Sequence, residues 1–204
     1  MKTKISAKNI EDIAFDMLQP FSGKTLTLMV SGGSILKILE SPSISELDKR
    51  EWSVYFADER IVPPTDKDSN FKDAQTFLAG VGKSFPVDTS LDHQAMLDDY
   101  REKLQNAKFD LAFLGIGEDG HIASIFPESS VIGSSDIVAI ISDSPKPPLE
   151  RLTITPLMLT MVKRLVFFVP RLPNGMIKSV DEPHFSILSQ LNTDILIVTV
   201  DPLS

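Results

Sequence analysis

Short runs of apolar and β-branched residues recur along the chain between stretches with helical periodicity. Six runs are predicted to be strands: residues 25–30, 52–57, 109–115, 137–141, 165–169 and 195–200. Four stretches are predicted to be helices: residues 9–18, 34–39, 93–106 and 156–162, the last with Thr155 as its cap and Pro156 as its first residue. This alternation is typical of an α/β domain with a buried, mostly parallel sheet. A length of 204 residues fits one domain, which we place at residues 1–204.

Loops rich in serine, glycine and charged residues follow five of the six predicted strands. In an open parallel sheet, ligands bind beyond the carboxyl ends of the strands. We therefore expect these loops to form one crevice. The strand ends that should line one edge of one sheet lie near Ser31, Asp58, Gly115, Ser142 and Pro170.

The turn Ser31-Gly32-Gly33-Ser34 lies between a predicted strand and a predicted helix. Its glycines allow backbone N–H groups to approach an anion, and the N-terminus of a helix favours negative charge, so the turn suits a phosphate. A tight turn in which a serine caps the helix explains the same residues equally well.

A second glycine-rich segment, residues 115–120, matches the G-x-G-x-x-G fingerprint of dinucleotide-binding domains. However, Glu118 and Asp119 would place two carboxylates where a pyrophosphate should bind. Pro127 would also end the next helix after about two turns, which is too short for a normal crossover. We therefore exclude nicotinamide binding and expect no cofactor. The segment is better explained as a tight turn that presents Asp119 and His121 at the crevice.

His121 is one of three histidines, and neither His93 nor His184 lies in a loop at a strand end. A lone histidine is more often structural than catalytic. Here Asp119 lies two residues earlier, where a carboxylate can orient the imidazole, and histidine is the natural base near neutral pH. The histidines lack the spacing of a metal site, so we expect no metal, although nearby acids could in principle hold magnesium.

Four cations lie in or near these loops: Arg60, Lys146, Arg151 and Lys178. Each alone would be interpreted as a solvated surface residue, and the acids next to Arg60 and Arg151 leave ordinary salt bridges open. Their placement in converging loops favours an anion-binding site. The Pro147–Pro148 pair would in addition hold Lys146 and Arg151 stiffly.

Composition narrows the classes of function. The absence of cysteine excludes disulfides, thiolate catalysis, zinc fingers and iron–sulfur clusters. A net charge of -8 and a pI near 4.9 disfavour nucleic acid, whereas a few converging cations still suit a small anion. No apolar run approaches the roughly 18 residues that a membrane helix needs, and no signal-peptide core appears. We expect a cytoplasmic protein without a membrane partner.

Together these motifs resemble the 6-phosphogluconolactonase family, within a superfamily that also contains glucosamine-6-phosphate deaminase. The resemblance covers most of the chain. It is carried by SGGS at 31–34, DERIVP at 58–63 followed by Ser69-Asn70, FDLAFLGIGEDGHIASIFP at 109–127 and SPKPPLERLTIT at 144–155. A deaminase usually has DEY in place of DER and AFNEP in place of ASIFP, and both differences favour the lactonase branch.

Two features depart from the family pattern. Ile122 stands where lactonases usually have threonine. The insertion-like segment 170–174 precedes Gly175, so the alignment of Lys178 and the role of Arg171 are left open.

The resemblance implies a three-layer, Rossmann-like fold of the type shared by these two enzyme groups. It implies hydrolysis of 6-phospho-D-glucono-1,5-lactone to 6-phospho-D-gluconate in the oxidative pentose phosphate pathway. His121 would be the general base, Asp119 would orient it, and Arg60 would stabilise the oxyanion. The residues expected to bind substrate are Ser31, Gly32, Gly33, Ser34, Asp58, Lys146, Arg151 and Lys178.

Two alternatives stay open. One is a glucosamine-6-phosphate deaminase or isomerase, and the other is a non-catalytic sugar-phosphate-binding module. In every case the expected partner is a small sugar phosphate, and we expect a monomer or a weak homo-oligomer.

Overall fold

A computed structural model describes residues 2–7, 9–117, 119–169, 191 and 193–200. The strands are β1 (Lys2–Ala7), β2 (Leu26–Val30), β3 (Trp52–Phe56), β4 (Asp58–Arg60), β5 (Lys83–Phe85), β6 (Leu111–Gly115), β7 (Val138–Ile141), β8 (Arg151–Ile154), β9 (Arg164–Val169) and β10 (Asp194–Val200). The helices are α1 (Ile10–Leu18), α2 (Ser34–Leu39), α3 (Pro42–Ser45), α4 (Asn70–Asp73), α5 (Gln75–Leu78), α6 (His93–Gln105) and α7 (Pro156–Thr160). Two 3-10 turns, η1 (Gln19–Phe21) and η2 (Ser130–Gly133), complete the described elements.

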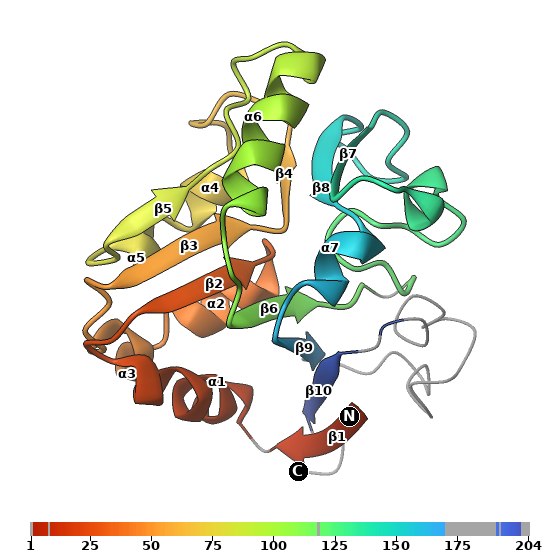
Figure 1. The fold of residues 1–204 in the computed structure, drawn as a ribbon. Helices are drawn as coiled ribbons and strands as arrows, with labels where there is room; N and C mark the ends of the chain where they lie inside the picture. Colours follow the sequence, from red (N-terminus) through yellow and green to blue (C-terminus); the bar gives the residue numbers. More distant parts are fainter. Residues whose placement is uncertain (1, 8, 118, 170–190, 192, 201–204) are drawn as a thin grey trace.

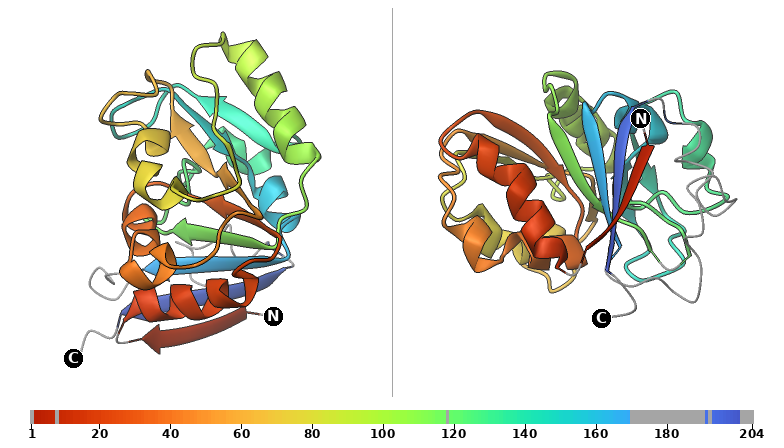
Figure 2. Two further views of the ribbon diagram at one scale, coloured as in Figure 1. Left: turned by 90° about the vertical axis from the view of Figure 1, so that its left-hand side faces the viewer. Right: turned by 90° about the horizontal axis from the view of Figure 1, so that it is seen from below.

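Seven strands form a parallel sheet in the order β1-β10-β9-β6-β2-β3-β5, and β4, β8 and β7 form a second, antiparallel sheet (Figure 1). Helices α1 to α5 lie on one side of the parallel sheet, whereas α6, α7 and the second sheet lie on the other (Figure 2). These are the three layers of a Rossmann-like α/β fold with a mostly parallel sheet, as the sequence predicted.

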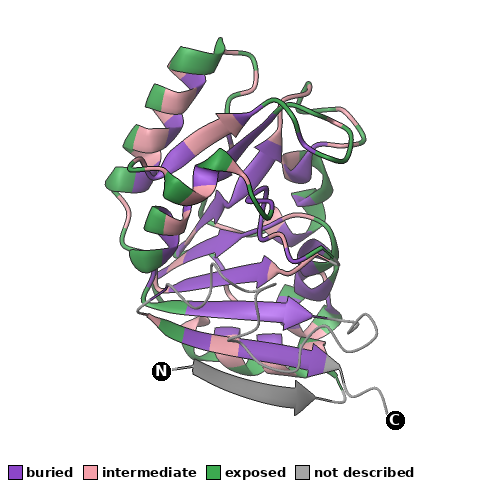
Figure 3. Ribbon diagram, turned by 90° about the vertical axis from the view of Figure 1, so that its right-hand side faces the viewer, coloured by how far each residue is buried: buried purple, intermediate pink, exposed green. Residues whose placement is uncertain are grey.

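The central strands are buried on both faces (Figure 3). Along β2, Leu28 and Val30 pack into the core beneath α1 and α2, whereas Met29 packs into the core beneath α6 and the second sheet. Burial on both faces explains why these strands are continuous apolar runs instead of alternating ones. No helix in the described part of the chain is long and apolar enough to cross a bilayer.

Five of the six predicted strands belong to the parallel sheet, but one assignment is wrong. The run 137–141 forms β7, which pairs with β8 in the antiparallel sheet, so the strand end at Ser142 does not lie on the edge that β2, β3 and β6 share. An apolar run indicates burial but not which strand it pairs with, and this is why the sequence misplaced it. The strand end near Pro170 lies outside the described residues.

All four predicted helices form, but the predicted cap of the last one and a further short helix do not. Thr155 precedes α7, but its hydroxyl donates to the carbonyl of Asp136 at 2.6 Å, and no side-chain bond caps the helix. The short helix that we expected Pro127 to end does not form in the described residues between β6 and η2. There Ile122 pairs with Ile116 and Ile125 in isolated bridges. The assignment of residues 1–204 to one domain stays a prediction.

The end of β3 is fixed by a tyrosine from α6. The hydroxyl of Tyr100 accepts a hydrogen bond from the Phe56 N–H at 2.9 Å and donates one to the Phe56 carbonyl at 2.6 Å. Tyr100 is fully buried, and burial raises the pKa of its hydroxyl far above the usual value, so it stays a neutral donor. One side chain thereby satisfies both backbone groups where β3 leads into β4.

Tyr100→Phe should therefore lower the free energy of unfolding by about 1–3 kcal/mol, because it leaves a buried N–H and a buried carbonyl without their partner. Urea unfolding would measure the loss. Tyr55→Phe is the matched control, since the Tyr55 ring stacks on Phe85 at 4.3 Å while its hydroxyl bonds to no described residue. Equal stability of the two variants would contradict this role of Tyr100.

Candidate active site

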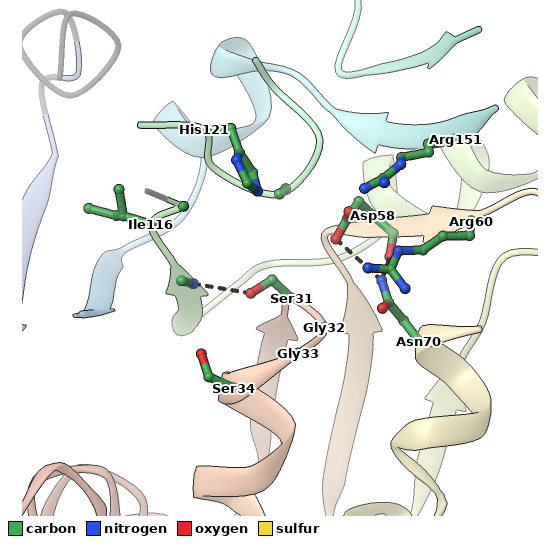
Figure 4. Close-up of a pocket in the computed structure, with 13 residues that line it drawn as sticks. Ser31, Gly32, Gly33, Ser34, Asp58, Arg60, Asn70, Ile116, His121 and Arg151 are labelled. Carbon is green, nitrogen blue, oxygen red and sulfur yellow. Dashed lines mark hydrogen bonds between the residues drawn. The ribbon is translucent and has the colours of Figure 1, made fainter. Parts of the chain in front are cut away.

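Loops from both sheets meet in a pocket of about 200 Å³ beyond the carboxyl ends of β2, β3 and β6 (Figure 4). Its lining residues are Ser31, Gly32, Gly33, Ser34, Asp58, Arg60, Asn70, Gly115, Ile116, Gly117, His121, Ala123 and Arg151. The crevice predicted from the polar loops therefore exists, and it contains both His121 and Arg60. Its second wall comes from the antiparallel sheet, through β4 and the first residue of β8.

His121 and Asp119 form a hydrogen-bonded pair on the loop that follows β6. The Nδ1 atom of His121 contacts Oδ1 of Asp119, and the His121 backbone N–H also donates to that oxygen at 3.4 Å. Partial burial would by itself raise the pKa of Asp119, but the hydrogen bond and charge of His121 outweigh it and hold this pKa below its usual value. Asp119 is therefore an ionised partner that fixes Nδ1, and it leaves Nε2 as the nitrogen available for chemistry.

Asp58 is buried in the pocket wall, and both of its carboxylate oxygens accept hydrogen bonds from the protein. The Ser124 hydroxyl donates to Oδ2 at 2.6 Å, and Nδ2 of Asn70 is 3.4 Å from Oδ1 and 2.9 Å from the Asp58 carbonyl. We predicted that Asp58 binds substrate. Asp58 lines the pocket and holds Asn70 and Ser124 in place, and its contact with substrate stays a prediction.

Glu59 is almost completely buried, with 2% of its surface exposed. Burial raises the pKa of its carboxyl, and the backbone N–H groups of Asn70, Phe71 and Arg60 offset part of that rise. These three donors lie 2.7, 2.8 and 2.8 Å from its carboxylate oxygens. Glu59 therefore ties the loop after β4 back to the pocket wall and does not itself line the pocket.

Two guanidinium groups reach the pocket without carboxylate partners. Arg60 donates from Nη1 to the carbonyl of Asp68 at 2.7 Å, and Arg151 donates to the carbonyls of Pro148 at 3.0 Å and Lys146 at 2.8 Å. Burial and the positive charge of Arg60 lower the pKa of Arg151 from its very high usual value. No ion pair within 4.0 Å in the described part of the chain involves either arginine, so the salt-bridge alternative is wrong for both.

Lys146 lies outside the pocket lining. Its side chain is 57% exposed, and its Nζ atom is 3.9 Å from Oδ2 of Asp119. Its backbone carbonyl, in contrast, anchors Arg151. Lys178 and Arg171 lie outside the described residues. The role of Lys178 therefore stays a prediction, and that of Arg171 stays open.

Asn70 lines the pocket and Ser124 bonds to the pocket residue Asp58, and neither was predicted as a site residue. Both are buried, and they lie 12 and 66 residues from Asp58 along the chain. Asn70 belongs to the Ser69-Asn70 pair that accompanies the DERIVP motif, which was the available signal. Gly32 lies against Asn70: a Cβ atom at position 32 would be 1.9 Å from Oδ1 of Asn70. This glycine is required for packing, whether or not the turn also binds an anion.

Among the described residues, no three side chains of His, Asp or Glu gather as metal ligands would. Metal independence stays a prediction, as does the absence of a cofactor.

An open parallel sheet with polar loops converging beyond its carboxyl ends defines the class of α/β ligand-binding domains. Comparison with known proteins places the chain within that class. It matches the family described as glucosamine-6-phosphate isomerases/6-phosphogluconolactonase over residues 3–170, and it therefore belongs to this family.

Curated relatives include 6-phosphogluconolactonase 3, chloroplastic, of Arabidopsis thaliana, which is 39% identical over 154 residues. That match covers 63% of this chain and 47% of the relative. The 6-phosphogluconolactonase of Bos taurus is 33% identical over 165 residues, covering 72% of this chain and 64% of the relative. The chain thus spans about half the length of the plant relative and less than two thirds of the bovine one.

Solved structures share the fold. A 6-phosphogluconolactonase from Thermotoga maritima superposes with a TM-score of 0.84 at 21% identity, covering 98% of this chain and 100% of that one. The corresponding protein from Leishmania guyanensis gives a TM-score of 0.81 at 20% identity, covering 98% and 96%.

Gly32→Ala should destabilise the fold by about 1–3 kcal/mol, because the added methyl group must displace the buried Asn70 amide from Asp58. Thermal and urea unfolding would measure this cost. Gly133→Ala is the control, since a Cβ atom there meets nothing within 4 Å. If both variants unfold like the wild type, Gly32 has no packing role.

Proposed function

We propose that this protein hydrolyses 6-phospho-D-glucono-1,5-lactone to 6-phospho-D-gluconate. The observation that carries the proposal is one pocket in which a carboxylate-oriented imidazole, His121, faces the unpaired guanidinium groups of Arg60 and Arg151. A base and concentrated positive charge are what hydrolysis of an anionic ester requires. The curated relatives named above carry the name 6-phosphogluconolactonase, which supports this substrate over others in the family.

In the proposed mechanism His121 acts as the general base. Because Asp119 engages Nδ1, the neutral imidazole carries its proton there and accepts a proton from water at Nε2. The water oxygen then forms a bond to the lactone carbonyl carbon, and the carbonyl π electrons move to its oxygen. The result is a tetrahedral oxyanion beside an imidazolium that Asp119 stabilises.

Arg60 is assigned to the oxyanion, as the sequence resemblance implies. Its guanidinium is held by the Asp68 carbonyl, so it is positioned before the charge develops. Collapse of the intermediate restores the carbonyl and breaks the bond from that carbon to the ring oxygen. The ring oxygen leaves with the proton from His121, which regenerates the base and releases the open-chain acid.

Arg151 and the hydroxyl groups of the 31–34 turn are assigned to the phosphate and ring hydroxyls. The Ser31 hydroxyl oxygen accepts a hydrogen bond from the Gly115 N–H at 3.1 Å, so its own proton remains available to donate. Lys146 on the rim adds positive charge near the entrance, and Lys178 stays a predicted contact. Location in the cytoplasm and a monomeric or weakly associated state also stay predictions.

The direct experiment generates the lactone in the assay mixture and compares its rate of hydrolysis with the spontaneous rate, with and without EDTA. We expect clear acceleration that EDTA does not change and a much weaker effect on the dephosphorylated lactone. Release of ammonia from glucosamine 6-phosphate would instead indicate a deaminase. Binding of 6-phosphogluconate without turnover would indicate a non-catalytic module, and magnesium-restored activity would overturn metal independence.

His121→Asn should keep the fold and lower kcat by about 10²- to 10⁴-fold, because asparagine retains a hydrogen bond but cannot accept the proton. KM should change less, provided that it approximates binding. His93→Asn is the control, since His93 does not line the pocket. It lies at the start of α6, where its Nε2 atom is 3.6 Å from Oε1 of Glu150. A near-wild-type rate for His121→Asn would show that another group is the base.

Arg151→Ala should weaken binding of 6-phosphogluconate by about 10- to 100-fold, the usual effect of losing a hydrogen bond to a charged group. Lys146→Ala should weaken it less, because Lys146 is exposed on the rim. Calorimetric titration would measure both affinities. Lys163→Ala is the matched control, since Lys163 pairs with Asp110 at the amino ends of the strands. Unchanged affinity in both test variants would show that neither cation binds the substrate.

A further inference from the structure

The imidazole of His121 lies directly against the backbone of Gly117. A Cβ atom at position 117 would be 2.1 Å from Cε1 and 2.2 Å from Nδ1 of His121, and 2.8 Å from Oδ1 of Asp119. All three distances are far shorter than van der Waals contact allows. The ring cannot move aside freely, because its Nδ1 atom is bonded to Asp119.

The backbone at Gly117 is also fixed. Its N–H donates to the carbonyl of His121 at 2.8 Å, and its carbonyl accepts from the N–H of Gly120 at 2.9 Å. Gly120 has a φ of +86°, which closes this tight turn in the left-handed region. Gly117 itself has no such φ, so only the lack of space at its Cα disfavours a side chain there.

An aromatic ring contacts the same imidazole. The ring of Phe126 has its centroid 4.9 Å from that of His121 at an interplanar angle of 39°, and Phe126 is only 7% exposed. The guanidinium carbon of Arg151 lies 5.8 Å from the Phe126 centroid. Phe126 thus lies against both the base and one of the two pocket cations.

We propose that Gly117 and Phe126 are positioning residues that form a slot for the His121 imidazole. The slot confines the ring to the orientation in which Nδ1 meets Asp119. This proposal rests on the proposed function, in which Nε2 of His121 takes the proton from water. The bare Cα of Gly117 provides the space for the ring, and Phe126 limits its movement toward the pocket wall.

Gly117→Ala tests the slot, with Gly133→Ala as a control. Both glycines have φ outside the left-handed region, but Gly133 does not line the pocket, and a Cβ atom at position 133 would meet nothing within 4 Å. Gly117→Ala should lower kcat by about 10²-fold, the usual cost of misplacing a catalytic group by roughly 1 Å. Its affinity for 6-phosphogluconate should change little, and Gly133→Ala should keep both values near those of the wild type.

A second comparison addresses Phe126. Phe126→Leu and Phe109→Leu both shorten a buried aromatic side chain, but Phe109 packs edge-on against Tyr55 away from the pocket. Both variants should lose stability, whereas only Phe126→Leu should lower kcat at saturating substrate. Equal kcat in these two variants would overturn the role of Phe126. A wild-type kcat for Gly117→Ala would overturn the role of Gly117.

Nitrogen-15 spectra of the imidazoles give a readout that does not depend on turnover. The chain has three histidines, so the His121→Asn spectrum assigns the His121 signals by their loss. Gly117→Ala should shift these signals and leave those of His93 in place, whereas Gly133→Ala should shift neither. If the wild type fails to hydrolyse the lactone, the proposed function is wrong, yet these spectra still test the slot. Unchanged His121 signals in Gly117→Ala would overturn it.

Discussion

The pocket depends on a carboxylate buried at the point where the two sheets join. Once Glu59 is taken out of water, its charge must be met by hydrogen bonds. The donors are three backbone N–H groups, from Arg60, Asn70 and Phe71, and the Ser69 hydroxyl, which is 3.3 Å away. The chain after β4 must therefore turn back, and this return brings Asn70 beneath Asp58 and sets Arg60 against the pocket. Tyr100 fixes the same junction from the opposite layer by holding the end of β3.

The positive charge of the pocket follows from the partners that this junction gives to its arginines and carboxylates. Arg60 and Arg151 are anchored by backbone carbonyls, while the nearby carboxylates of Asp58 and Glu59 are occupied by neutral donors. The pKa of Arg151 is lowered by burial and by repulsion from Arg60, and the charges of Asp58 and Asp68 offset only part of this effect. An anion that enters between them relieves this repulsion, so the fold itself favours a negatively charged ligand.

The sequence predicted the layers, the main helices and most of the parallel strands, because apolar runs and caps are local signals. It also predicted that the loops bearing Ser31, Arg60 and His121 converge, because parallel strands share one edge. It missed β4 and β8, which pair with each other in the antiparallel sheet and contain buried polar residues. The contacts of Asn70 with Gly32 and of Ser124 with Asp58 join residues far apart in sequence, and no local pattern encodes such pairs.

The connection between the adjacent strands β6 and β9 contains β7 and β8 of the second sheet, α7 and the His121 loop. The sheet register is set by β6 and β9 themselves, which pair directly along residues 111–115 and 164–168. The proposed base His121, its partner Asp119 and the cation Arg151 thus belong to a crossover whose length and chemistry can vary without shifting that register. New activities on this scaffold are therefore expected to arise from sequence changes within the crossover, while the parallel strands keep their pairing.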